Sequence, residues 1–361
     1  MKPIFSIAFL FLTFFLLTSC TTQTQTLQIG AVLALTGPAA SYGEEARNGL
    51  ELAAAEINEQ GGINGKMVEI LYEDDQTDPK QSVTAFTKLA DVNHVAGMIG
   101  GTWDFNYNAI APLAEQYHIT LITPQNVKTT GTLTNEYTFI MRPQLKTLAE
   151  TLEGYIRDHR ILRIAIVRFV SVFGQDIAEA MKDIAQRTGG KFILDETYGS
   201  IGGNDFQTTI TKLKQAKADA VFLDMVDTDY VNFLKRRKEL GLDATILTHA
   251  ALNSLLPNPN IDKSLFHGIV YFDWDTPPSD VFTQKYRAKY GRNPTNSADG
   301  AYDSLMIMAE ALSHVPPDQA NQYLQSHTFK TANGEFRFKD QVISNRDIFV
   351  KEVTPNGIKV L

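Results

Sequence analysis

Apolar runs that alternate with amphipathic helices constrain the fold of this chain more than any other feature. Gln28 to Leu35 is an almost unbroken apolar run, as expected of a parallel strand buried on both faces. Apolar residues recur at helical spacing from Glu44 to Glu59, and Met67 to Tyr72 is a second short strand. The alternation repeats after Pro79 and again after Pro143. This pattern predicts an α/β fold of doubly wound parallel sheets.

The length of the chain predicts two lobes. At 361 residues it is about twice a typical domain. Arg142-Pro143 marks a first crossover, the segment Gly268 to Trp274 is expected to return the chain to lobe one, and Ile348 to Val353 is expected to cross back. We therefore expect lobe one at 27–141 plus 273–345 and lobe two at 142–272 plus 346–361, joined by a three-segment hinge.

The first 26 residues predict export and a lipid anchor. Lys2 precedes an apolar run from Ile4 to Leu17, which is too short to span a bilayer and is typical of a signal peptide. Leu17-Thr18-Ser19-Cys20 follows as a lipobox, so residues 1–20 form a lipoprotein signal peptide and the Cys20 thiol is the group to be acylated. A buried structural cysteine is the alternative for this single Cys. Residues 21–26 are polar and are expected to act as a tether, with the protein facing the periplasm or the cell exterior.

Charge and motif content argue against several classes of function. The net charge of −8 disfavours nucleic acid and anionic lipid as partners, since both select basic surfaces. The sequence has no G-x-S-x-G, H-E-x-x-H, G-x-x-x-x-G-K-[ST] or G-x-G-x-x-G motif, and its histidines are scattered singly. Glu73, Asp74 and Asp75 could hold a metal or supply a general acid, although Asp residues after a strand are usually turn formers and caps. We expect neither an enzyme nor a metal site.

Three motifs in one stretch carry a family resemblance. They are TGP…YG from Thr36 to Gly43, GGINGK from Gly61 to Lys66, and EDDQTDPKQS from Glu73 to Ser82. In this order and spacing they resemble the leucine/isoleucine/valine-binding protein family, the type I periplasmic solute-binding proteins of ABC transporters. The resemblance implies a monomer without cofactors, a small-molecule solute held between two lobes, and an ABC permease as membrane partner.

Candidate ligand-binding residues follow the carboxyl ends of the predicted strands, where ligands bind in such sheets. In the family the Tyr of the TGP…YG motif, here Tyr42 in a loop, faces the cleft, and Phe173-Gly174 stands where the family has an aromatic-Gly pair facing the ligand. Trp103 follows a strand beside Thr102 and is expected to stack on the ligand, with ordinary packing between helix and sheet as the alternative.

The sequence departs from the amino-acid-binding pattern at two places. The positions that hold the ligand carboxylate in the family carry Asp104, Gln125 and Asn126 here, and an anionic Asp104 would repel a carboxylate unless it only caps the following helix. The family's acidic contact for the ligand ammonium aligns with Ala250, so we expect Asp224 and Asp227 to replace it, although Asp227 could simply cap a helix.

Because of these departures, the resemblance does not identify the solute as a branched-chain amino acid. We expect an amino acid or an amino-acid-like amide or amine. The alternative function is a lipoprotein sensor or an activator of an envelope enzyme built on the same fold.

Overall fold

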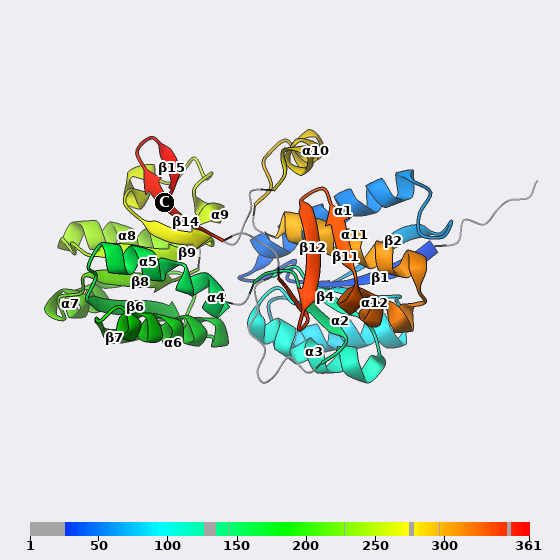
Figure 1. Ribbon diagram of the computed structural model, residues 1–361, viewed down its shortest axis with the longest axis horizontal. Coiled ribbons are helices and arrows are strands. Elements are labelled where there is room, and N and C mark those ends of the chain that lie inside the picture. Colours follow the sequence, from blue (N-terminus) through cyan, green and yellow to red (C-terminus); the bar gives the residue numbers. More distant parts are fainter. Residues whose placement is uncertain are drawn as a thin grey trace, which may run out of the picture.

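The computed structural model describes residues 26–125, 135–143, 145–226, 228–273, 278–295, 297–344 and 348–361. They form two lobes that lie side by side along the long axis of the molecule, each a sheet flanked by helices (Figure 1). The predicted fold class, two doubly wound α/β lobes, is confirmed.

The first lobe is built on an eight-stranded sheet. Its strands are β1 (Thr26–Leu33), β2 (Met67–Asp74), β3 (Met98–Gly100), β4 (Leu121–Thr123), β5 (Thr138–Ile140), β11 (Thr328–Thr331), β12 (Gly334–Lys339) and β13 (Val342–Ile343). The strand order is β11-β12-β13-β5-β4-β3-β1-β2. The strands from β13 to β2 pair in parallel, whereas β12 runs antiparallel to both β13 and β11.

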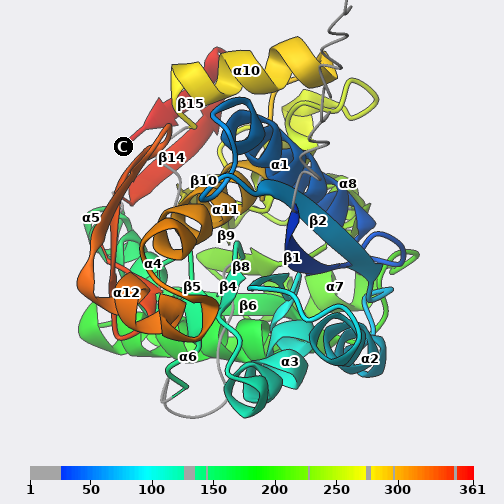
Figure 2. The ribbon, with the colours of Figure 1, turned by 90° about the vertical axis from the view of Figure 1, so that its right-hand side faces the viewer.

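Helices cover both faces of this sheet. They are α1 (Ala40–Glu59), α2 (Pro79–Asp91), α3 (Asp104–Tyr117), α10 (Asp280–Tyr290), α11 (Ala298–His314), α12 (Ala320–Ser326) and the 3-10 turn η2 (Pro317–Gln319). Ile29 and Leu33 of β1 belong to the core beneath α1 and α11, while Val32 belongs to the core beneath α2 and α3. Figure 2 shows these two helix pairs on opposite sides of the strands. A strand buried on both faces explains the unbroken apolar run from which the fold was predicted.

The second lobe repeats the plan with seven strands. They are β6 (Arg163–Phe169), β7 (Lys191–Tyr198), β8 (Ala220–Asp224), β9 (Thr245–His249), β10 (Val270–Asp273), β14 (Phe349–Thr354) and β15 (Gly357–Val360), in the order β15-β14-β10-β9-β8-β6-β7. Its helices are α4 (Leu145–Glu150), α5 (Leu152–Asp158), α6 (Val172–Arg187), α7 (Gln207–Gln215), α8 (Thr228–Leu240), α9 (Leu252–Leu255) and the 3-10 turn η1 (Lys263–Phe266). One core lies beneath α4, α5 and α6, and the other beneath α7, α8, α9 and η1.

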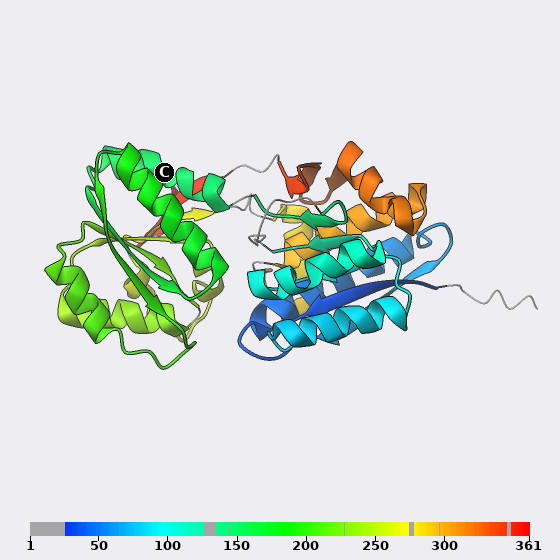
Figure 3. The same ribbon diagram turned by 90° about the horizontal axis from the view of Figure 1, so that it is seen from below.

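The chain passes between the two sheets three times. The passages lie between β5 and α4, between β10 and α10, and between β13 and β14. Figure 3 shows the C-terminus on the second lobe, where the third passage delivers it. This arrangement is the three-segment hinge that the sequence predicted.

One predicted passage is wrong in its position. The segment from Gly268 was expected to enter lobe one, but Val270 to Phe272 pair in parallel with β9 and Asp273 lies opposite Phe349 of β14. Asp273 therefore belongs to the second sheet and not to lobe one. A short buried apolar run looks the same in either sheet, because sequence alone does not give its pairing partner.

Candidate ligand-binding site between the lobes

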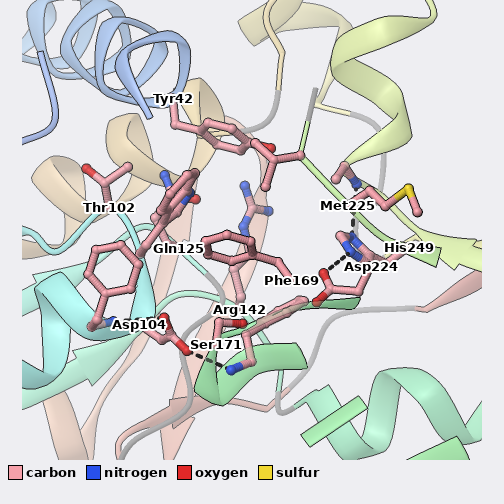
Figure 4. A pocket seen from close by; sticks show the side chains of 15 residues that line it. Tyr42, Thr102, Asp104, Gln125, Arg142, Phe169, Ser171, Asp224, Met225 and His249 are labelled. Carbon is pink, nitrogen blue, oxygen red and sulfur yellow. Dashed lines mark hydrogen bonds and ion pairs between the residues drawn. The ribbon is translucent and has the colours of Figure 1, made fainter. Parts of the chain in front are cut away.

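A cavity lies where the carboxyl ends of strands from both sheets meet (Figure 4). The cavity has a volume of about 110 Å³ and is partly open to solvent. Lobe one lines it with Tyr42, Thr102, Trp103, Asp104, Phe105, Gln125 and Arg142; lobe two lines it with Phe169, Ser171, Phe173, Asp224, Met225, Val226, His249 and Ala251. Both lobes would therefore touch a molecule held in this cavity.

Aromatic rings form much of the wall. In lobe one Tyr42 meets Trp103 edge-on at 6.4 Å between ring centroids, and Trp103 meets Phe105 in the same way at 5.6 Å. In lobe two Phe173 meets the ring of His249 edge-on at 5.3 Å. Such rings offer apolar contact area and π faces, so the cavity suits a solute with an apolar or aromatic part.

Asp104 connects the two lobes. Its Oδ2 accepts a hydrogen bond of 2.6 Å from the backbone N–H of Phe173, in the first turn of α6, while Oδ1 accepts one of 2.8 Å from the N–H of Phe105. Burial raises the pKa of the Asp104 carboxyl, the two N–H groups oppose the rise, and nearby Asp224 adds to it. Asp104 is the first residue of α3 and Trp103 is the N-cap, so the Asp104 carboxylate accepts one N–H from the first turn of its own helix and one from the start of a helix in the other lobe.

Asp224 and His249 follow neighbouring strands and form a hydrogen-bonded pair in lobe two. The Nε2 of His249 lies 3.1 Å from Oδ1 of Asp224, and its Nδ1 accepts from the backbone N–H of Ala251 at 3.3 Å. Nε2 of His249 therefore faces the Asp224 carboxylate, and Nδ1 faces the chain that follows β9. Oδ2 of Asp224 is buried and has no hydrogen-bond donor among the described residues.

Arg142 and Gln125 complete the polar lining from lobe one. Arg142 forms a buried ion pair with Asp299 of α11, with 2.8 Å between Nη2 and Oδ1, and its Nε donates to the carbonyl of Pro124. The Nε2 of Gln125 donates to the hydroxyl of Ser297 at 2.6 Å. These bonds hold both side chains against lobe one. Their positions in the cavity are therefore fixed before a solute binds.

Comparison with known proteins places the chain in a family. The sequence matches the profile of the periplasmic binding protein family over residues 26–357. The chain is a periplasmic binding protein. A leucine-, isoleucine-, valine-, threonine- and alanine-binding protein of Pseudomonas aeruginosa is 26% identical over 342 residues, which cover 91% of this chain and 90% of that protein.

Solved structures share the fold of this periplasmic binding protein while holding different solutes. The branched-chain amino acid transporter substrate-binding protein of Streptococcus pneumoniae, in complex with isoleucine, has a TM-score of 0.83 and 21% identity over 93% of this chain and 99% of that one. A solute-binding protein of Rhodopseudomonas palustris in complex with 3,4-dihydroxy benzoic acid has a TM-score of 0.79 and 21% identity over 92% of this chain and 95% of that one. The fold is thus shared across solutes of different chemistry, so the solute must be argued from the lining.

Seven residues that the sequence analysis singled out line this one cavity. They are Tyr42, Thr102, Trp103, Asp104, Gln125, Phe173 and Asp224. Three other predicted residues, Cys20, Asn126 and Asp227, lie outside the described residues. Contact of the seven with a solute stays a prediction.

Two of the seven differ in local setting from what the sequence suggested. Tyr42 lies in the first turn of α1 and not in a loop, because α1 begins at Ala40. The hydroxyl of Thr102 accepts from the backbone N–H of Ala34 at 3.0 Å, so it serves mainly to fix the loop after β1.

Several lining residues were missed. Phe169 and His249 stand at the ends of β6 and β9, and Ser171 follows β6, so the strand-end rule that identified Asp224 applies to them as well. Arg142 was seen only as part of a crossover. Phe105 had no signal of its own beyond lying next to Asp104.

The acidic run after β2 holds loops together, as its alternative interpretation predicted. Oδ1 of Asp74 accepts from the backbone N–H groups of Leu35 and Thr36, and Oδ2 accepts from the Thr36 hydroxyl at 2.6 Å. Within the described ranges, no three His, Cys, Asp or Glu side chains are grouped so as to hold a metal ion. None of the described helices is both long and apolar enough to cross a bilayer.

Proposed function

We propose that this periplasmic binding protein is the solute-binding component of an ABC importer and captures an amino acid or an amino-acid-like amide or amine between its lobes. The carrying observation is the cavity whose polar and aromatic lining comes from the strand ends of both sheets. A solute that touches both lobes favours their closed arrangement by its difference in affinity for the closed and open states. The names of the relatives from P. aeruginosa and S. pneumoniae support an amino acid or a similar compound.

We also propose that the protein is exported and held to the membrane through acylated Cys20, with residues 21–26 as tether. The supporting observation is the position of Cys20 directly after the apolar run and the small residues Thr18 and Ser19. Mass spectrometry of the membrane-extracted protein should find the chain starting at an acylated Cys20. A mature protein that still carries residues 1–19 would contradict this.

Solute binding can be tested by thermal shift followed by calorimetry with amino acids, amino acid amides, polyamines, short peptides, aromatic acids and sugars. We expect amino acids, amides or amines to raise the melting temperature, and Tyr42→Ala to weaken binding on the order of tenfold because an aromatic wall of the cavity is lost. The control is Tyr117→Ala, at the far end of α3, which should leave affinity unchanged.

The outcomes separate solute class from function. If only aromatic acids or sugars bind, the proposed solute class is wrong and a binding function stands. If the folded protein binds none of these compounds and copurifies with a cell-wall synthase instead of a permease, the transport function is wrong.

A further inference from the structure

Asp104 places a carboxylate of the protein at the start of helix α6, in the wall of the cavity. It accepts the N–H of Phe173 at 2.6 Å, in the first turn of α6, a helix of 16 residues. The start of a helix favours an anion because its N–H groups are unpaired and its dipole is positive there. Asp104 is 4% exposed and already accepts this hydrogen bond. The N–H of Phe173 is therefore not available to a carboxylate of the solute.

The two basic side chains of the lining, Arg142 and His249, already have partners within the protein. Arg142 is paired with Asp299, and both side chains are 2% exposed. His249 is held between Oδ1 of Asp224 and the N–H of Ala251. Apart from Arg142 and His249, the described lining holds no basic side chain to set against the carboxylates of Asp104 and Asp224. A second anion brought into this space would be repelled, and a cation would be attracted.

Asp224 presents an acceptor that the protein leaves unused. Its side chain is 6% exposed, His249 donates to Oδ1 only, and Oδ2 has no donor among the described residues. A buried acceptor without a donor costs free energy until a hydrogen bond is made. Asp224 lines the cavity, but Oδ2 itself is packed beside Gly174 at the start of α6, so an N–H donor of the solute reaches it once the carboxylate turns toward the cavity (Figure 4).

We propose that the solute is a small amine with an apolar or aromatic body and no free carboxylate. This rests on the proposed solute-binding function. The ammonium binds the Asp224 carboxylate, and the body lies against Tyr42, Trp103 and Phe173. Asp104 is a carboxylate of the protein at the start of α6, so the solute needs none of its own there. Aromatic faces attract an ammonium as well as an apolar group, so the walls suit both parts of such a solute.

The test is calorimetry with pairs of compounds that differ only in the carboxylate: 3-methylbutylamine against leucine, and 2-phenylethylamine against phenylalanine. The amine of at least one pair should bind more tightly by on the order of tenfold or more. Asp224→Asn should lower amine affinity to a similar extent, because the charge that attracts the ammonium is lost. Asp104→Asn should reduce the difference in affinity between the amine and the amino acid. It removes the charge that repels the solute carboxylate and keeps an oxygen that can accept the hydrogen bond from the N–H of Phe173.

The control is Asp205→Asn, an exposed carboxylate of lobe two that pairs with Arg236 outside the cavity. It should change neither affinity nor preference. The comparison of amine with amino acid in the wild-type protein needs no variant, so it decides the matter even if a cavity variant does not fold.

The results that would overturn the proposed amine specificity differ from the result that would overturn the solute-binding function. If the wild-type protein binds the amino acid of each pair as tightly as the amine, or binds only compounds without an amine, the inference is wrong and solute binding stands. If no small molecule binds the folded protein at all, the proposed function fails with it.

Discussion

At the scale of single residues, Asp75 is a carboxyl group that folding removes from water. It is 0% exposed, accepts from the N–H of Thr77 and lies 3.2 Å from the hydroxyl of Ser82. Burial raises its pKa from 3.8 to about 6, with Asp74 and Asp78 adding to the rise. Since the folded pKa is above the unfolded one, the stabilising contribution is complete below about pH 4 and is lost as pH rises through about pH 6.

We therefore expect Asp75→Asn to flatten part of the pH dependence of stability. Between about pH 4 and about pH 7 the wild-type protein should lose on the order of 2 kcal/mol of unfolding free energy relative to the variant, because only the wild type must ionise a buried carboxyl. Chemical denaturation at a series of pH values measures the difference. Parallel curves for the two proteins would show that Asp75 titrates normally.

Gly174 is a second residue whose identity the site requires. A Cβ at this position would lie 2.6 Å from Oδ2 of Asp224 and 2.6 Å from the carbonyl of Phe169. Gly174→Ala should therefore displace the Asp224 carboxylate and weaken solute binding on the order of tenfold. The matched control is Gly154→Ala in α5, where a Cβ meets nothing within 4 Å and should stabilise the helix by about 0.5–1 kcal/mol. Equal affinities for the two variants would contradict this role.

The residue scale also shows where prediction from sequence ends. Trp103 and Asp224 could be placed at the cavity because they lie at or just after the ends of strands in parallel sheets, where ligands bind, and Tyr42 because of its place in the TGP…YG motif. The hydrogen bond from the N–H of Phe173 to Asp104 could not be predicted, because the two residues are 69 positions apart in sequence and lie in different lobes. A short carboxylate before a helix looks like a cap for that helix until the neighbouring lobe is in view.

At the scale of elements, helix α6 has its N-cap inside the cavity. The hydroxyl of Ser171 accepts from the N–H of Gly174 at 2.8 Å. Ser171→Ala should cost about 1 kcal/mol of unfolding free energy, as is usual for the loss of a cap. It should also weaken solute binding, because the first turn of α6 carries the N–H that meets Asp104.

Asp78 is the residue for comparison, since it caps α2 through the N–H groups of Lys80 and Gln81. Asp78→Ala should cost about as much stability and leave affinity unchanged, because α2 is not part of the cavity. Urea denaturation and calorimetry on both variants check this. A loss of affinity in Asp78→Ala equal to that in Ser171→Ala would mean that affinity follows general stability.

Helices and strands with a clear apolar pattern were predictable from the sequence, whereas the strands with which they pair were not. The strands β1 and β2 and the helix α1 were evident from sequence because apolar content and spacing are local properties. The last residue of β10, Asp273, was placed in lobe one because the position of β10 between β9 and β14 depends on pairing over long sequence separations.

At the scale of the whole molecule, Arg142 ties the first hinge passage to the body of lobe one. Its guanidinium meets both oxygens of Asp299, at 2.8 and 3.4 Å, and lies under the cavity at the point where the chain leaves β5. Two buried charges that neutralise each other are tolerated, whereas one left alone is costly. The pair therefore fixes where the hinge begins relative to the site.

Asp299→Asn should lower the free energy of unfolding by about 3–5 kcal/mol, because Arg142 is left as a buried charge without its partner. The control is Asp205→Asn, which removes the exposed partner of Arg236 and should cost less than about 1 kcal/mol. Replacing both members, Arg142→Met with Asp299→Leu, should recover much of the loss, since no charge then remains buried. Denaturation curves followed by circular dichroism separate these cases. If the double replacement is as unstable as Asp299→Asn, the loss comes from packing around α11 and not from an unpaired charge at the hinge.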